Sequence, residues 1–304
     1  MLPRGGGRKP VLELFVVSML NGLSYGLLLF LLSAGLTLIL GIMGVLNFAH
    51  ASFYMLGAYL GYAINQQLGY APALILAPAL LGVAGAVFEH VVLRRVHSQG
   101  HVAELLVTFG LSYVVLEAVQ LLWGRAPLNF ALPQALQGTQ LWWVDLPVSR
   151  LFMMGLSLLV LALLWAVLHR TRTGLVVQAA IRHPDMVQAL GHNVPALRML
   201  VFGLGSALAG LAGVMGGSTF VTEPGMAGAM GAVVFVVIVV GGMGSLWGAF
   251  VASLLIGLLQ TLALSLDVQL PGVASARLAP ALPFVLMVLM LVWRPRGLLG
   301  KRES

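Results

Sequence analysis

The sequence predicts an all-α membrane protein, a polytopic bundle of about eight to ten transmembrane helices. Hydrophobic residues make up 60% of the 304 residues, charged residues only 8%, and the mean hydropathy is +1.01. Such a chain has lipid as its main solvent, and about 20 apolar residues suffice for one crossing. About eight to ten spans with short connections account for all 304 residues and leave none for a separate soluble domain. We therefore expect one membrane domain over residues 1–304.

Apolar segments follow one another along the whole chain. We expect spans near residues 11–32, 34–46, 53–68, 72–92, 104–123, 150–168, 196–217, 228–244, 246–266 and 278–293. The second segment is too short for an ordinary crossing, which indicates a short or broken segment near residues 34–52. Short spans interrupted by glycine are the sequence feature that best indicates the substrate site of a transporter.

Basic residues are unevenly distributed between alternate connections. With a cytoplasmic N-terminus, 13 of the 16 Lys and Arg residues fall on the inner side, and only Arg125, Arg150 and Arg277 fall outside. This distribution obeys the positive-inside rule and, with an even number of crossings, predicts that both termini are cytoplasmic. The basic cluster before the first span also resembles a signal peptide. No convincing Ala-x-Ala cleavage site follows it, so we expect an uncleaved first span.

Asn47, His50 and Ser52 form a polar cluster between two segments that must both lie in lipid. Such groups persist in hydrocarbon only where they line a wet cavity or are paired inside a bundle. We hypothesise that they contribute to a substrate passage, because amide and hydroxyl groups pair weakly with the ammonium and carboxylate of a zwitterion. The polar residues expected to face them are Asn21, Tyr25 and Thr37. The structural alternative is that Ser52 caps the next helix and His50 satisfies backbone groups at the break.

Glu117 is a carboxylate well inside the 104–123 span. An intramembrane glutamate is a functional candidate by default, and a proton relay is the most specific interpretation. Its span offers no basic partner and no second acid close by. We therefore favour a protonated or hydrogen-bonded structural role.

The loop of about residues 170–195 has the features of a docking element. Pro184 suits the first turn of a short helix, Asp185 favours the positive end of that helix, and Gly191 with Asn193 provides a stop. We expect a short amphipathic helix parallel to the membrane. The alternative is a solvated basic loop that only fixes the topology.

Small residues recur at every fourth position in several spans, as in Gly205, Ala209, Gly213 and Gly217. In lipid this spacing lets helix backbones approach closely. We expect these seams to pack within the chain rather than between subunits.

Several short motifs run along the chain. They include Asn47-Phe48-Ala49-His50, Gly191-His192-Asn193 with Arg182 and Asp185, Gly241-Gly242-Met243-Gly244-Ser245 and Arg294-Pro295-Arg296-Gly297-Leu298. With these motifs the chain resembles, nearly end to end, the permease subunits of branched-chain amino acid ABC transporters, most closely the LivH-like branch. The Asn-Phe-Ala-His motif is the most specific. The family usually has glycine at the next position, where this chain has Ala51.

The resemblance implies an integral protein of a prokaryotic inner membrane. It also implies assembly with a second, LivM-like permease subunit, two cytoplasmic ATPase subunits and an external substrate-binding protein. The chain would contact membrane lipid, and no nucleic acid partner is expected. The 170–195 loop would be the coupling loop, and its ATPase-coupling residues would be Arg182, Asp185, Gly191 and Asn193. We expect no cofactor or metal in this chain. Its lysines, Lys9 and Lys301, complete no Gly-x-x-x-x-Gly-Lys-Ser/Thr motif, so partner subunits would hydrolyse the ATP.

The expected cargo is a branched-chain or other hydrophobic amino acid. A urea or short-amide ABC permease is one alternative. A self-sufficient channel or gradient-driven carrier is another, and it explains the spans, the broken segment and the glycine seams but not the docking loop. We expect no enzyme, because the chain has no Gly-x-Ser-x-Gly, no His-Glu-x-x-His and no pair of spans that each offer an aspartate.

Overall fold

The computed structural model describes residues 11–44, 46–139, 146–266, 269–270 and 273–300. The longer helices are α1 (Val11–Met43), α2 (His50–Leu68), α3 (Tyr70–Phe88), α5 (His101–Trp123), α6 (Val148–Arg170), α9 (Val194–Thr219), α10 (Met226–Gly241), α11 (Leu246–Leu266) and α13 (Leu282–Trp293). The shorter ones are α4 (Arg94–Val96), α7 (Arg172–Arg182), α8 (Pro184–Ala189), α12 (Ser275–Leu278), a π-helical turn (Glu89–Leu93) and 3-10 turns at His97–Gln99 and Gln134–Leu136. β1 (Gln269–Leu270) and β2 (Val273–Ala274) form a small antiparallel hairpin.

Six helices in the described part of the chain are long and apolar enough to cross a membrane: α1, α3 with the turns that follow it, α5, α6, α9 and α11. The shorter apolar helices α10 and α13 and the 19-residue α2 complete the bundle. The predicted fold class, a polytopic helical membrane bundle, is confirmed.

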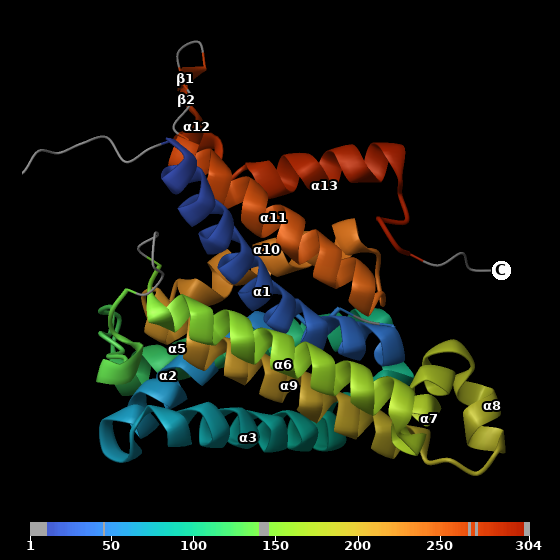
Figure 1. The fold of residues 1–304 in the computed structure, drawn as a ribbon. Helices are drawn as coiled ribbons and strands as arrows, with labels where there is room; N and C mark the ends of the chain where they lie inside the picture. The colour runs from blue at the N-terminus through green and yellow to red at the C-terminus, as the bar shows by residue number, and fades with distance from the viewer. Residues whose placement is uncertain (1–10, 45, 140–145, 267–268, 271–272, 301–304) are drawn as a thin grey trace, which may run out of the picture.

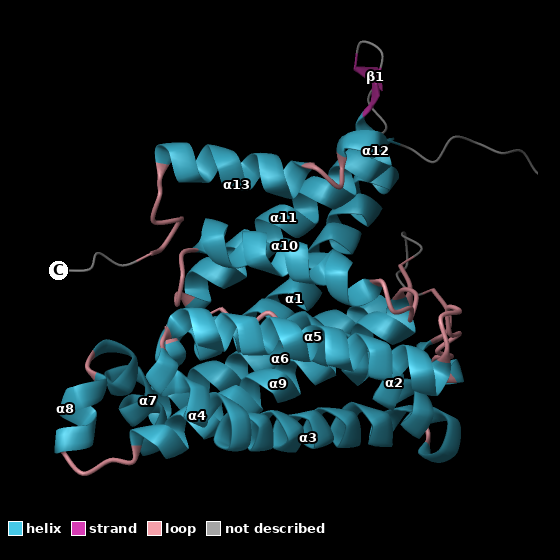
Figure 2. Cartoon of the chain, turned by 180° about the vertical axis from the view of Figure 1, so that it is seen from behind, coloured by secondary structure: helices cyan, strands magenta, loops and turns pink. Residues whose placement is uncertain are grey.

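The two ends of the bundle differ. Helices α3, α5, α6 and α9 run alongside one another, and α7 and α8 project from one end, which we call the α8 end (Figure 1). The opposite end, which we call the α12 end, carries α12, the β1–β2 hairpin and the connection from α5 to α6 (Figures 1 and 2).

The first membrane helix differs from the prediction. α1 is one continuous helix of 33 residues, so the two predicted spans 11–32 and 34–46 are a single span. The boundary predicted between residues 32 and 34 is wrong, and Gly35 there serves close packing, since a Cβ at Gly35 would lie only 2.6 Å from the Gly205 carbonyl oxygen. The helix ends at Met43, and Gly44 follows with a φ of +69°, a conformation that glycine adopts without strain.

One span fewer changes the arrangement of the chain ends. α1 starts at the α12 end, whereas the residues that follow α13 lie at the α8 end (Figure 1). The prediction of two cytoplasmic termini came from the positive-inside distribution together with an even number of crossings. It stays a prediction, because residues 1–10 and 301–304 lie outside the described residues.

Helix α9 occupies the centre of the bundle and packs against α1, α2 and α3. Its small residues lie inside the chain, as predicted. A Cβ at Gly57 of α2 would lie 2.6 Å from the Cα of Gly210, and one at Gly217 would lie 2.7 Å from the Cβ of Ala58. The same close approach joins α1 to α11, where a Cβ at Gly22 or Gly26 would lie 2.9 Å from a backbone Cα of α11. These contacts fix α2 against α9 and thereby position the start of α2.

Candidate functional site

The connection from α1 to α2 returns into the bundle. His50, the first residue of α2, lies beside Leu32, about three turns before the end of α1. Asn47 shapes the turn, because its Oδ1 accepts a hydrogen bond from the backbone N–H of Ala49 at 3.0 Å. The N–H of Phe48 donates to Thr108 Oγ1 of α5 at 3.3 Å. The predicted broken segment therefore includes residues 46–49, inside the expected range, and brings irregular backbone to membrane depth, where it is tolerated only beside protein or a cavity.

His50 is held against α1. Its Nε2 lies 2.9 Å from the carbonyl oxygen of Leu32, and because a carbonyl only accepts, Nε2 carries the proton. The other ring nitrogen, Nδ1, is a buried acceptor without a hydrogen-bond partner. His50 thus satisfies a backbone carbonyl, as the structural alternative expected, and still has one free acceptor.

Ser52 does not cap α2. That helix begins two residues earlier, at His50, and the Ser52 hydroxyl instead donates to the carbonyl oxygen of Ser112 on α5 at 3.5 Å. No side chain caps α2; Asn47 only shapes the turn before it. Asn47 itself keeps one buried donor, Nδ2, without a partner.

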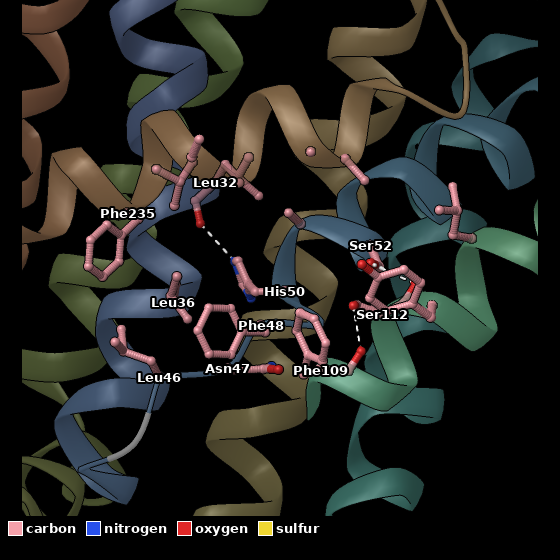
Figure 3. Close-up of a pocket in the computed structure, with 18 of the residues that line it drawn as sticks. Leu32, Leu36, Leu46, Asn47, Phe48, His50, Ser52, Phe109, Ser112 and Phe235 are labelled. Carbon is pink, nitrogen blue, oxygen red and sulfur yellow. Dashed lines mark hydrogen bonds between the residues drawn. The ribbon is translucent and has the colours of Figure 1, made fainter. Parts of the chain in front are cut away.

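A cavity of about 710 Å³ lies where α1, α2, α5, α10 and α13 meet. Asn47, His50 and Ser52 all line it (Figure 3). The rest of the lining is mainly apolar: Leu32 and Leu36 come from α1, and Phe235 from α10. A concave, largely apolar cavity with a few polar groups is typical of a small-molecule site.

Three aromatic side chains at the cavity come from α5 and from the connection between α1 and α2. The rings of Phe48 and Phe109 meet edge to face with centroids 6.0 Å apart, and Phe109 contacts Tyr113 of α5 in the same way at 5.1 Å. All three residues line the cavity and are exposed in the single chain. The cavity therefore opens beside α5.

Asn21, Tyr25 and Thr37, expected to face the polar cluster, are not among the residues that line this cavity. Thr37 is buried, but Leu32 and Leu36 form the α1 face that meets the cavity, and Thr37 is rotated about 100° from Leu36. Tyr25 contacts Phe220, and Asn21 lies further toward the α12 end. Both residues are too far along the continuous α1 to reach His50.

Helices α7 and α8 form the loop predicted to dock a partner. Pro184 begins α8 with Asp185 in its first turn, as predicted, and Gly191 follows the helix with a φ of +87°. The loop holds two helices rather than one. Asn193 caps the next helix instead of ending α8, because its Oδ1 accepts from the N–H of Ala196 at 3.0 Å. Arg182 and Asp185 are both exposed.

The outer surface of α7 and α8 is unusually apolar for a basic loop. Val187 packs inward on Ala180 and Val194. Met186 and Leu190 are instead 66% and 79% exposed, beside the charged side chains. An apolar surface rimmed by charge is typical of a protein-binding site.

A second polar cluster at the α8 end was not predicted. His97 Nδ1 pairs with the Glu104 carboxylate, and Arg198 donates to His97 Nε2 at 2.6 Å. Glu89 lies nearby in the π-helical turn, and together with Arg94 and Arg198 it lines a cavity of about 230 Å³. Glu89 and Glu104 stand at the ends of two apolar spans, and a search of the sequence for acidic residues at span ends would have indicated them. Glu117, which the sequence singled out, is exposed on α5.

Comparison with known proteins decides the family. The family model described as "Branched-chain amino acid transport system / permease component" matches residues 18–291. The chain belongs to this permease family. The permease is 28% identical over 97% of its length to the high-affinity branched-chain amino acid transport system permease protein BraD of Pseudomonas aeruginosa, and 98% of BraD is covered.

Two further relatives come from Escherichia coli K12. The permease is 27% identical to the permease protein LivH over 95% of this chain and 96% of LivH. It is 26% identical to the permease protein LivM over 88% of this chain and 67% of LivM. Among solved structures, a chain of PsaBC from Streptococcus pneumoniae in complex with Fab aligns over 91% of each chain with 12% identity and a TM-score of 0.49, too low a similarity to support an argument.

Proposed function

We propose that this chain is the transmembrane permease subunit of an importer that moves branched-chain or other hydrophobic amino acids across the inner membrane, powered by separate ATPase subunits. The chemistry of the large cavity supports this function best. Its apolar walls suit an apolar side chain, and its polar residues, Asn47 and His50, are placed together at one side. Urea or a short amide would gain little from such walls.

The unpaired atoms of the cavity match a zwitterion. Asn47 Nδ2 is a free donor suited to a carboxylate, and His50 Nδ1 is a free acceptor suited to an ammonium. Both atoms are buried in this conformation, so binding requires the Asn47 and His50 side chains to shift slightly. Neutral hydrogen bonds bind a substrate weakly, and weak binding allows its release toward the cytoplasm.

ATP-driven movement would enter through α7 and α8. Their exposed Met186 and Leu190 suit the groove of a cytoplasmic ATPase, with Arg182 and Asp185 beside them. Within the chain, α7 packs on the end of α1, since a Cβ at Gly41 would lie 3.4 Å from Ile181 Cδ1. α1 leads directly into the segment that carries Asn47. A displacement of α7 would therefore be transmitted to the cavity through the short stretch of backbone at the end of α1.

A second permease subunit would cover α5. Glu117 is exposed on that helix, and the neighbouring Leu121 is 84% exposed. A carboxyl group facing lipid is costly, so a protein partner with a donor for Glu117 is the more stable arrangement. The cavity opens beside the same helix. Escherichia coli holds two different permease proteins with the same transport-system name, LivH and LivM, and both are similar to this chain.

The basic residues orient the bundle with the α8 end in the cytoplasm. Of the eleven described arginines, eight belong to connections and helix ends there: Arg94, Arg95, Arg170, Arg172, Arg182, Arg198, Arg294 and Arg296. The other three, Arg125, Arg150 and Arg277, belong to the α12 end. By the positive-inside rule, α1 starts outside and the residues after α13 lie inside.

Purification from native membranes tests the proposal. The tagged chain is extracted gently and its companions are identified by mass spectrometry. Recovery of ATPase subunits and a second permease in stoichiometric amounts supports the importer. Recovery of this chain alone, as a stable homo-oligomer, would favour a channel or a gradient-driven carrier.

A further inference from the structure

Two glycines of α10, Gly228 and Gly231, form part of the cavity wall. They are three residues apart and so lie on one face of the helix. A Cβ at Gly228 would meet nothing within 4 Å, whereas a Cβ at Gly231 would lie 3.0 Å from the Cβ of Ala51. At Gly231 the wall touches α2, and at Gly228 it leaves open space.

The open space at Gly228 is not explained by packing within the chain. Several glycines of this bundle allow backbones to approach closely, as Gly57 does against Gly210, and a few, such as Gly155, meet nothing. Gly228 makes no such approach. Because Gly228 has no side chain, the cavity is larger at this position.

Unpartnered polar atoms at the same cavity indicate a ligand. Asn47 is 4% exposed and His50 is 1% exposed, and each keeps one buried polar atom without a partner. Ala51, which touches the Gly231 position, follows His50 directly in the sequence. A ligand whose polar groups meet Asn47 and His50 would thus have its remaining part beside α10.

We infer that Gly231 and Gly228 set the size of the apolar side chain that the cavity accepts. The inference rests on the proposed function and specifies its substrate class, a zwitterion with a branched or larger apolar side chain. The side chain passes Gly231 first, where the Ala51 methyl group narrows the wall. It then reaches Gly228, about 4.5 Å further along α10, where bare backbone leaves room for its end.

Uptake measurements on the complex purified with its partners and reconstituted in vesicles test this assignment. Rates for alanine, valine, leucine and phenylalanine are compared in the wild type and in Gly228→Ala, Gly228→Val and Gly228→Leu. Gly155→Leu is the matched control, because Gly155 is also a helical glycine with nothing within 4 Å of its Cβ position but does not line the cavity.

We expect the variants to discriminate between substrates by size. Gly228→Leu should lower leucine and phenylalanine uptake at least about tenfold relative to alanine uptake, and Gly228→Val should lower them by a smaller factor. Gly155→Leu should leave these uptake ratios unchanged. Ala51→Gly acts in the opposite sense and raises phenylalanine uptake relative to leucine uptake. An equal loss for all four substrates in the Gly228 variants, or unchanged ratios with the complex intact, would overturn the inference.

The remaining outcomes are also decisive. If Gly228→Val and Gly228→Leu no longer co-purify with the second permease while Gly155→Leu does, the open face at Gly228 belongs to a subunit contact and the inference is wrong. If the wild-type complex carries none of the four amino acids, the proposed function itself fails. The two failures are therefore distinguishable.

Discussion

Ile181 of α7 packs against Gly41 in the last turns of α1, with its Cδ1 3.4 Å from the position of a Cβ there. Gly44 ends this helix three residues later, and Asn47 and His50 follow. The docking element and the polar side of the cavity are thus joined by fewer than ten residues of chain. This relationship underlies the coupling that we propose.

Truncating Ile181 should uncouple ATP hydrolysis from transport. Ile181→Ala removes the contact of α7 with α1 and leaves the outward surface of α7 and α8 unchanged. We expect more ATP to be hydrolysed per amino acid carried, by about three- to tenfold, as for a coupling free energy of about 1 kcal/mol. Leu163→Ala on the exposed side of α6 is the control. An unchanged ratio in Ile181→Ala would exclude this contact from coupling.

Asn47 offers a pair of variants that separate its turn-forming oxygen from its free donor. Asn47→Asp keeps the oxygen that accepts from the Ala49 N–H but replaces the free Nδ2 donor by an acceptor. It should lose uptake by tenfold or more, because the new charge repels a carboxylate, and burial of that charge should also lower thermal stability. Asn47→Ala adds no charge and should lower stability by about 0.5–1.5 kcal/mol through loss of the bond to Ala49. Thermal unfolding and uptake are both measured, and full uptake by Asn47→Asp would remove the amide from the mechanism.

His50 carries both a structural bond and a free acceptor. His50→Gln can still donate to the Leu32 carbonyl oxygen, whereas His50→Ala cannot and should lose about 1 kcal/mol of stability from that bond alone. We expect both variants to carry amino acids poorly, with His50→Gln the more stable. Unchanged uptake by His50→Ala in an intact assembled transporter would show that the imidazole serves folding only.

The polar cluster at the α8 end should stabilise the bundle. Glu104→Ala leaves His97, which in turn accepts from Arg198, without its carboxylate, and because His97 is partly exposed we expect a loss of about 1–3 kcal/mol. Glu117→Ala, on the exposed face of the same helix, should change thermal stability of the isolated chain by less than about 0.5 kcal/mol. It should instead weaken co-purification of the second permease. Equal effects of the two variants on stability would contradict this division of roles.

The orientation is testable by single cysteines, because the wild-type chain has none. Gln137→Cys lies at the α12 end and His192→Cys lies beside α8. In intact cells an impermeant maleimide with access to the outer face of the inner membrane should label the first. The second should need permeabilised membranes. The reverse pattern would invert the proposed topology.

The sequence predicts the spans well because lipid imposes a strong and simple pattern. Eight of the expected segments correspond to α2, α3, α5, α6, α9, α10, α11 and α13 within a few residues. The error at α1 has a physical cause. The sequence does not distinguish a glycine that ends a helix, such as Gly44, from a glycine that allows another helix backbone to approach closely, such as Gly35.

The part of the candidate site that is local in sequence could be predicted to lie together, and the part that depends on packing could not. Asn47, His50 and Ser52 are close in sequence and meet at one cavity. Part of the wall that faces them comes from α10, almost 180 residues later, and includes glycines that carry no chemical signal. The contacts from Glu104 to His97 and from His97 to Arg198 also depend on how α9 packs, which periodicity alone does not reveal.

Transport by the purified complex tests the central claim most directly. The chain is reconstituted in vesicles with its co-purified partners, and leucine uptake is measured with and without ATP on the α8 side. The account predicts uptake that requires both ATP and the partners. Leucine movement by this chain alone, unaffected by ATP, would contradict it.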